Sequence, residues 1–161
     1  MLAGRRPIEF ELERTIPAPM DAVFARLVDI DGYNDWLVGT GSMLRRTRQT
    51  SPGPPRPGTT FVDETSQGTQ DGQIVELQAP HTVVFHWWDT SRSGRRTFQG
   101  WPGYRLEPLG DNETLVRHRG RLLAYGVWQL GKPLWRRLAI RERTRVVDAL
   151  AASFRGGPEP G

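Results

Sequence analysis

The sequence predicts an α+β domain in which a seven-stranded antiparallel sheet wraps around one long C-terminal helix, with two short helices after the first strand. Three observations predict it: strict apolar/polar alternation over residues 8–16, strand-like segments separated by turn residues from 42 to 123, and an apolar helical stripe over 131–154. Only that helix is long enough to cover the sheet. Because one helix cannot fill the concave face of a curved sheet, we expect a ligand cavity between them.

The first elements follow from the alternation and from proline. One face of the first strand is apolar except for a single arginine, and it carries Ile8, Phe10, Leu12, Arg14 and Ile16. Pro17 ends this strand, and Pro19 suits the first turn of a helix. Apolar residues at helical spacing then predict a short helix, with Met20, Val23, Phe24 and Leu27 on its buried face. The segment from Asp29 to Leu37 predicts a second short helix or turn.

The middle of the chain predicts six further strands, at 42–49, 59–66, 72–79, 82–89, 96–109 and 113–123. Their connectors are short and rich in turn-forming residues. Pro102, which lies between two glycines, predicts a bulge or kink in the longest strand. The final helix has an apolar stripe of Leu134, Trp135, Leu138, Ala139, Val146, Ala149 and Leu150. We therefore expect one domain over 8–154, with flexible ends at 1–7 and 155–161.

Composition excludes several classes of protein. The chain has 161 residues and includes six Trp, six Phe and three Tyr, which must be buried, so it is not disordered. It contains no cysteine, which excludes disulfide frameworks, thiolate metal sites and cysteine nucleophiles. The start lacks the apolar run of a signal peptide, and no stretch has the length of a membrane span. A cytoplasmic protein without membrane insertion is expected.

The positive charge does not predict a nucleic-acid partner. The net charge is +4, and because Lys132 is the one lysine, 21 of the 22 basic residues are arginines. They are spread over nearly every segment among acidic residues, whereas nucleic-acid-binding domains gather them on one face. The three histidines lie on unrelated strand phases or in a turn and match no metal-ligand spacing. No metal and no cofactor is therefore expected.

The sequence resembles the START-like (SRPBCC) superfamily with its helix-grip fold, and within it the polyketide cyclase/dehydrase and lipid-transport group. The resemblance covers residues 8–154. The segments that carry it are Phe10–Pro19, Val23-Phe24, Leu27–Asp29, Tyr33–Trp36, Gly58–Phe61, Glu76–Pro80, Val83–Phe85, Tyr104–Pro108 and the last helix. It implies a shared scaffold and cavity, with activities that diverge among members.

The resemblance also implies where the cavity opens. It places the loops Gln67–Asp71 and Thr90–Arg95 at the mouth, beside the connector Ala124–Lys132. Arg92, Arg95 and Arg96 would then form a collar for carboxylate, phosphate or carrier-protein groups. Alternatively, they belong to a solvated loop whose charges only aid solubility.

His118 is the first candidate site residue. Three arginines occupy the opposite parity of the strand Thr114–Leu123, so His118 points inward. There it would contact the ligand or act as a general acid or base. Alternatively, it is a buried neutral histidine with a structural hydrogen bond. If it recognises the ligand, replacing His118 with Phe would lower affinity and leave the melting temperature nearly unchanged.

Further candidates are charged residues on apolar faces and large aromatic residues. Arg14 and Glu142 each interrupt an apolar face, so they are expected to pair, either polarising a substrate carbonyl or tying the helix to the sheet. Arg145 is an alternative, local partner of Glu142. Asp63 faces inward if Phe61 does. The aromatic residues expected to line the cavity are Trp36, Phe61, Trp87, Tyr104 and Trp128.

Three functions remain open. The first is binding of a polyketide-, lipid- or quinone-like hydrophobic small molecule, with polar groups used for orientation. The second is an aromatase/cyclase that promotes aldol cyclisation or dehydration of a polyketide chain, with His118, Tyr104 and Arg14 as catalytic candidates and an acyl carrier protein as a partner. The third is a co-chaperone-like interaction module. The protein is expected to be a monomer or a homodimer.

Overall fold

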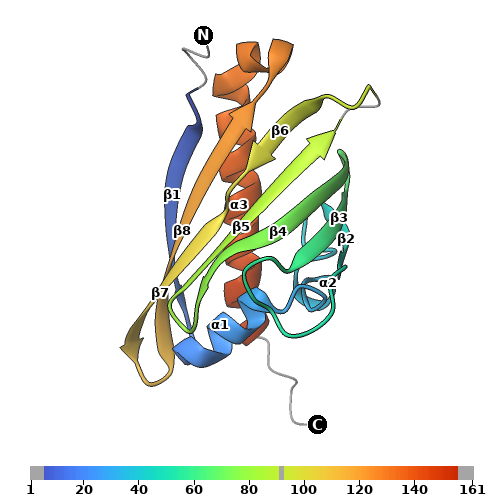
Figure 1. Cartoon of the computed structure of the whole chain (residues 1–161). Coiled ribbons are helices and arrows are strands. Elements are labelled where there is room, and N and C mark those ends of the chain that lie inside the picture. Colours follow the sequence, from blue (N-terminus) through green and yellow to red (C-terminus); the bar gives the residue numbers. More distant parts are fainter. Residues whose placement is uncertain (1–5, 91–92, 156–161) are drawn as a thin grey trace.

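The computed structural model describes residues 6–90 and 93–155. In chain order the elements are β1 (Ile8–Ile16), α1 (Met20–Val28), α2 (Tyr33–Trp36), β2 (Leu44–Gln49), β3 (Thr60–Thr65), β4 (Gly68–Gln78), β5 (Thr82–Thr90), β6 (Arg96–Gly100), β7 (Gly103–Gly110), β8 (Glu113–Ala124), the 3₁₀ helix η1 (Gly126–Gly131) and α3 (Lys132–Arg155). The expected ends at 1–5 and 156–161 and Arg92 of the expected collar lie outside the described residues. The helix-grip fold is confirmed: one antiparallel sheet curves around α3, with α1 and α2 near one end of that helix (Figure 1).

The strand predicted at 96–109 is two strands. β6 and β7 occupy one position in the sheet in succession, because both pair with β8 and with β5. Trp101 and Pro102 separate them while their backbone groups keep bonding to the neighbours: Trp101 N donates to Arg121 O and Phe85 N donates to Pro102 O. The predicted interruption at Pro102 is confirmed, and the sheet therefore has seven positions along its path built from eight strands.

The predicted loop Gln67–Asp71 is shorter than expected. Thr65 pairs with Gly68, so only Ser66 and Gln67 form the turn, and β4 starts at Gly68. The φ of Gly68 is 116°, a conformation that glycine adopts without steric cost, and this closes the tight turn.

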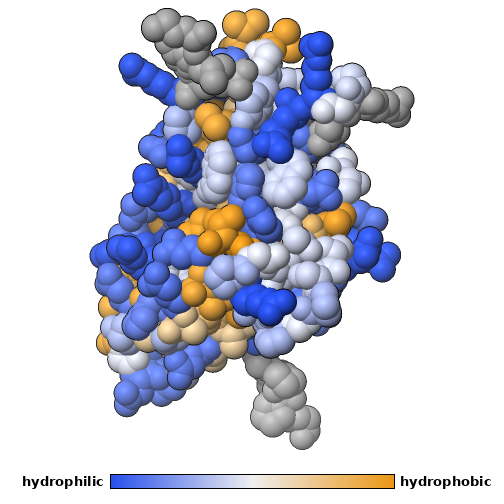
Figure 2. Space-filling model, viewed as in Figure 1, coloured by the Kyte–Doolittle hydropathy of each residue, from blue (hydrophilic) through white to orange (hydrophobic). Residues whose placement is uncertain are grey.

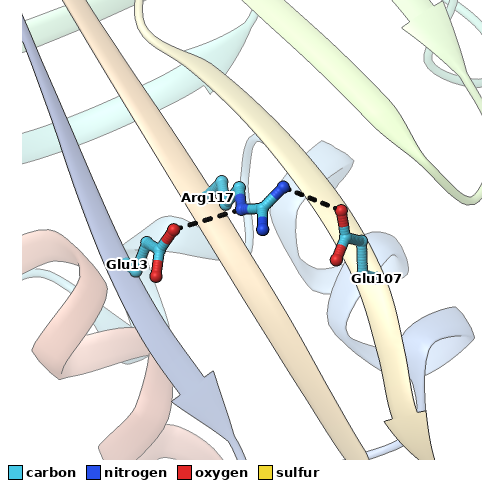
Figure 3. Close-up of polar contacts among 3 residues, drawn as sticks. All are labelled: Glu13, Glu107 and Arg117. Atoms are coloured by element: carbon cyan, nitrogen blue, oxygen red, sulfur yellow. Dashed lines mark hydrogen bonds and ion pairs between the residues drawn. The ribbon is translucent and has the colours of Figure 1, made fainter.

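The outer face of the sheet carries the charges that the alternation placed there. Arg117 on β8 lies between Glu13 on β1 and Glu107 on β7, at N–O distances of 3.1 and 2.9 Å (Figure 3). Arg119 and Arg121 on the same parity both approach Glu9. These cross-strand pairs agree with the register of β8, whose other face is turned to the interior.

The core is built against the inner face near α1. Val23, Phe24 and Leu27 of α1 are buried against residues of the sheet and the end of α3. The N-terminal end of α3 is less covered, as the exposed fractions of Leu134 (52%) and Leu138 (46%) show. These two residues were predicted to lie on the buried stripe. They lie instead at the end formed by η1, where Figure 2 shows hydrophobic surface.

Candidate functional site

A cavity of about 770 Å³ lies between the inner face of the sheet and α3. Its walls come from strands, from α2 and from one side of α3, and the wall residues are mainly apolar or aromatic. Exposed members of the lining mark where it reaches the surface: Ser66 and Gln67 at the β3–β4 turn, and Trp128 and Leu138 at the η1 end. A partly open, mainly apolar chamber of this size suits a small-molecule ligand.

Three aromatic side chains of the cavity wall lie over glycines on neighbouring strands. The pairs are Phe10 with Gly120, Phe61 with Gly72, and Trp87 with Gly100. A Cβ atom on these glycines would lie 2.2, 2.3 and 2.6 Å from the nearest ring atom, respectively. The absence of a side chain therefore lets each ring lie close to the sheet. This arrangement keeps the aromatic walls flat and leaves space in front of them.

The polar part of the cavity wall is built around Arg143 of α3. Its Nε donates to Nε2 of His118 at 2.8 Å, and its Nη2 donates to the hydroxyl oxygen of Tyr104. Tyr104 and His118 are cross-strand partners in β7 and β8, and their rings stack with centroids 4.3 Å apart. The sheet register thus presents a hydroxyl and an imidazole side by side to one guanidinium group.

The hydrogen bonds determine the tautomer of His118. Because Nε2 accepts from Arg143, the proton is on Nδ1, which donates to the carbonyl of Gly103 at 2.8 Å. Burial, followed by the charge of Arg143, lowers the pKa of His118 well below its usual value. The imidazole is fully buried and neutral, with both nitrogens occupied. Its geometry is therefore that of a positioning residue for Arg143.

His118 faces inward, as the alternation predicted, but it does not line the cavity. Direct contact between His118 and a ligand is therefore not supported by this arrangement and stays a prediction, because Tyr104 stacks on the imidazole ring and Arg143 occupies its Nε2. A role as general acid or base is likewise not supported, since neither nitrogen is available to a ligand. The alternative interpretation, a buried neutral histidine with a structural hydrogen bond, fits the contacts.

Asp63 of β3 lines the same cavity. Burial raises the pKa of its carboxyl to about 6, against the opposing effects of a hydrogen bond from Thr47 and of the charge on Arg143. A carboxyl group with this pKa exchanges a proton near neutral pH, as a weak general acid or base must. The inward placement predicted from the parity with Phe61 is confirmed, and both residues line the cavity.

The cavity wall contains four of the five predicted aromatic residues, namely Phe61, Trp87, Tyr104 and Trp128. Trp36 is the exception, and its predicted place in the wall is wrong. On α2, Tyr33 lines the cavity and donates from its hydroxyl to Leu27 O, whereas Trp36 lines a second hollow between α1, α2 and the C-terminal part of α3. The two rings do lie on one face, as their spacing predicted, with centroids 4.6 Å apart, but Trp36 packs against the buried apolar clusters instead of the cavity.

The predicted pair of Arg14 and Glu142 is wrong. Arg14 binds Asp148 at 2.6 Å, and the two side chains are 37% and 57% exposed. Glu142 lines the cavity, but its carboxylate accepts from the Ser42 hydroxyl and the Met43 amide. Positions 142 and 148 lie about 600° of rotation apart on a helix, and therefore face different neighbours. Arg14 ties helix to sheet and does not line the cavity.

The alternative partner of Glu142, Arg145, donates to the carbonyl of Gly41 instead. The predicted arginine collar is not formed by the residues that can be placed. Arg96 donates to Gln99 and lies over the ring of Trp88, and neither Arg95 nor Arg96 is in the cavity wall. Trp88 has the opposite parity to Trp87, so Arg96 is turned to the outer face.

Arg143 was not among the predicted site residues. Its signal in the sequence is positional: it lies four residues after Ala139 and three before Val146, on the stripe that faces the sheet. A cation on that stripe requires a polar environment inside the fold. Because α3 contains six arginines, one of them on its apolar stripe is not conspicuous in the sequence.

Other kinds of site are not found among residues 6–90 and 93–155. In this part of the chain no three His, Asp or Glu side chains gather in a way that would hold a metal ion. The helices described here are all too short or too polar to cross a bilayer.

Comparisons with known proteins agree with this fold. The protein is similar in structure to the Zhui aromatase/cyclase from Streptomyces sp. R1128, with a TM-score of 0.77 at 12% identity over 96% of this chain and 98% of that one. It is also similar to a START superfamily protein from Mycobacterium smegmatis (TM-score 0.70, 11% identity, 91% and 97% coverage). A third similar structure is the Mll3558 protein from Rhizobium loti (TM-score 0.66, 23% identity, 92% and 98% coverage).

These likenesses are low in sequence identity and establish the fold. A search of curated proteins found no match to the sequence. The family model for polyketide cyclase / dehydrase and lipid transport, in contrast, matches residues 7–155. The chain therefore belongs to the polyketide cyclase/dehydrase and lipid transport family.

Proposed function

We propose that this protein binds a hydrophobic small molecule, of polyketide, lipid or quinone type, in the cavity under α3. Arg143 and Tyr104 would hold an oxygen atom of that molecule. The walls supply apolar and aromatic contact for its carbon skeleton, and flat rings over glycines suit a ligand that itself contains rings.

The observation that carries the proposal is a pair of hydrogen-bond donors in an apolar chamber. Arg143 uses Nε and one Nη2 hydrogen for His118 and Tyr104, which leaves Nη1 and the other Nη2 hydrogen to donate. The Tyr104 oxygen accepts from Arg143, so its own hydrogen is also left to donate. Carbonyl, enol, phenol and carboxylate oxygens all match such a site.

Binding can be tested with the purified protein. Native mass spectrometry should detect a co-purified apolar molecule, and titration with the fluorescent dye N-phenyl-1-naphthylamine should saturate. Filling the chamber by Ala139→Trp should abolish saturable binding, because Ala139 lines the cavity. The exposed residue Arg137, on the same helix, provides the control Arg137→Trp, which should bind as the wild type does. Non-saturable dye binding and no co-purified molecule would contradict the proposal.

Catalysis by an aromatase/cyclase mechanism is a second candidate, favoured by the carboxyl of Asp63. A weak base with a pKa of about 6 shares the cavity with donors suited to an enolate oxygen. Asp63 would remove the proton next to a ketone, the Arg143–Tyr104 pair would stabilise the enolate, and the enolate carbon would form a bond to a second carbonyl carbon. Protonated Asp63 would return its proton to the new alkoxide, and removal of a second α-proton with departure of the hydroxyl would release water. Asp63 replaces His118 as the proposed base, and Arg14 has no role in this scheme. An acyl carrier protein would present the chain.

The enzymatic candidate can be tested with a synthetic poly-β-ketone thioester. Chromatography with mass spectrometry should show formation of a cyclised, dehydrated product, at least tenfold faster than without protein. Asp63→Asn should remove this acceleration while the dye N-phenyl-1-naphthylamine still binds. If the wild-type protein binds the dye and accelerates no cyclisation of the thioester, this candidate is wrong and binding alone remains.

A further inference from the structure

We infer that the molecule held in this cavity is an amphipathic organic anion, whose carboxylate or similarly acidic enol or phenol oxygen lies between Arg143 and Tyr104. This inference rests on the proposed binding function and adds the ionic class of the ligand. It distinguishes organic acids from neutral hydrocarbons, alcohols and esters of the same size.

The first argument is that the charge of Arg143 is not neutralised by the protein. The ion pairs found within residues 6–90 and 93–155 involve Arg14, Arg117, Arg119 and Arg121. Thus no described carboxylate lies within 4.0 Å of the guanidinium of Arg143. A half-buried cation in an apolar chamber is costly unless an anion accompanies it.

The carboxylate beside Arg143 in the sequence is directed elsewhere. Glu142 accepts hydrogen bonds from the Ser42 hydroxyl at 2.5 Å and from the Met43 amide at 3.0 Å. Two donors from the segment before β2 hold it away from its neighbour on α3. The acidic residue adjacent to Arg143 in the sequence is thus bonded to other partners, and Arg143 lines the cavity without it.

His118 orients Arg143 without cancelling its charge. A carboxylate at this position would bind the guanidinium and neutralise it, whereas a neutral imidazole accepts the Nε hydrogen and leaves the positive charge in place. The bond from Nδ1 to Gly103 keeps the imidazole in the accepting tautomer. The remaining donors of Arg143 are therefore held in one direction with a full charge, which suits an anionic partner.

Asp63 is the remaining acidic group in this part of the cavity. It lies close enough for Arg143 to lower its pKa, yet burial dominates and the pKa stays near 6. In its protonated form Asp63 provides no counter-charge and would itself donate to a ligand oxygen. An incoming carboxylate at Arg143 would therefore meet the guanidinium cation and the Tyr104 hydroxyl, with protonated Asp63 as a further donor in the same cavity wall. The charge of Glu142 acts on Tyr104 from the same wall, but its oxygens accept from Ser42 and Met43.

The inference can be tested with two probes that share one ring system and are similar in size, 9-anthracenecarboxylate and 9-anthracenemethanol, titrated at pH 6 and followed by fluorescence. The wild-type protein should bind the carboxylate at least tenfold more tightly than the alcohol. Arg143→Met should remove that preference by weakening carboxylate binding, with alcohol binding changed less than twofold. Arg137→Met removes one positive charge from an exposed position of the same helix, and should keep the preference.

A second variant guards against misfolding of Arg143→Met. Tyr104→Phe keeps the ring that stacks on His118 and removes one donor, so it should reduce the preference several-fold in a folded protein. Equal affinity for both probes in the wild type would overturn the inference and leave the proposed binding function intact. A preference that survives in Arg143→Met would also overturn it. If N-phenyl-1-naphthylamine binds saturably but neither anthracene probe does, the inference alone is wrong. If the dye does not bind either and no molecule co-purifies, the proposed function is wrong as well.

Discussion

Nε of Arg143 donates a 2.8 Å hydrogen bond to Nε2 of His118, joining the middle of α3 to the inner face of β8. The nitrogen with which a general base would accept a proton from a ligand already accepts from Arg143, and the other nitrogen donates to Gly103. His118 therefore acts on a ligand only through Arg143. Substitutions at this position should affect stability and ligand orientation together.

His118→Phe should lower both the melting temperature and the preference for an anionic probe. The phenyl ring removes the acceptor of Arg143 and the donor to Gly103, and an unpaired buried polar group costs about 1–3 kcal/mol. Thermal unfolding and titration with the two anthracene probes measure the two effects. His86→Phe is the matched control, because His86 lies on the outer face, stacked on Trp101, and should leave the probe preference unchanged. An unchanged melting temperature for His118→Phe would support the simple recognition role expected from the sequence.

The fold could be predicted from the sequence because period-two alternation and turn residues are local signals. The three arginines at alternate positions of β8 predicted which of its faces is turned outward. Their ion pairs with acidic residues of the neighbouring strands confirm that prediction. The segment that forms η1 shows neither alternation nor helical spacing, so the sequence predicts only a connector there. Its apolar residues Val127 and Leu130 are exposed. The division between β6 and β7 was visible as Pro102, since proline cannot supply a ladder donor.

The candidate site was less predictable because pairing between distant charges depends on the rotation of α3. Alternation along the strand predicted that Asp63 faces inward, and it showed that Arg14 is a charged residue on an otherwise apolar face. It could not distinguish Asp148 from Glu142 as the partner of Arg14. Arg143 is one of seven basic residues in the 24 positions of α3, so its charge alone does not single it out. Its place on the apolar stripe is the one feature that distinguishes it.

Asp63→Asn should stabilise the protein at neutral pH. The pKa of Asp63 rises from 3.8 to about 6 on folding, so the folded state favours the protonated form. Stability contributed by this group is therefore lost as pH rises from about 4 to about 6, and the loss stays constant above that. The variant should gain up to about 3 kcal/mol at pH 7 and almost nothing at pH 4. Chemical denaturation at both pH values measures this, and an equal gain at pH 4 would contradict it.

The affinity for 9-anthracenecarboxylate should fall roughly three- to tenfold between pH 5.5 and 7.5, because ionised Asp63 repels the bound anion. Of the groups that affect Asp63 from neighbouring elements, Arg143 on α3 stays charged and Thr47 on β2 has no charge. Burial raises the pKa of Tyr33 well above 10.0, so Tyr33 stays neutral in this range. In Asp63→Asn the pH dependence should disappear. A slope that persists in the variant would assign it to another group.

Gly72→Ala should narrow the cavity and weaken binding of both anthracene probes at least fivefold. The new Cβ would lie 2.3 Å from the ring of Phe61, and the ring must move away from the sheet into the ligand space. Overpacking of this kind costs about 1–3 kcal/mol, so the melting temperature should fall as well. The double variant Gly72→Ala/Phe61→Leu replaces the ring with a smaller side chain and should recover probe binding. Gly110→Ala is the control for the substitution itself, because a Cβ there meets no atom within 4 Å. If Gly72→Ala binds both probes like the wild type, flat packing of Phe61 on glycine is not what keeps the chamber open.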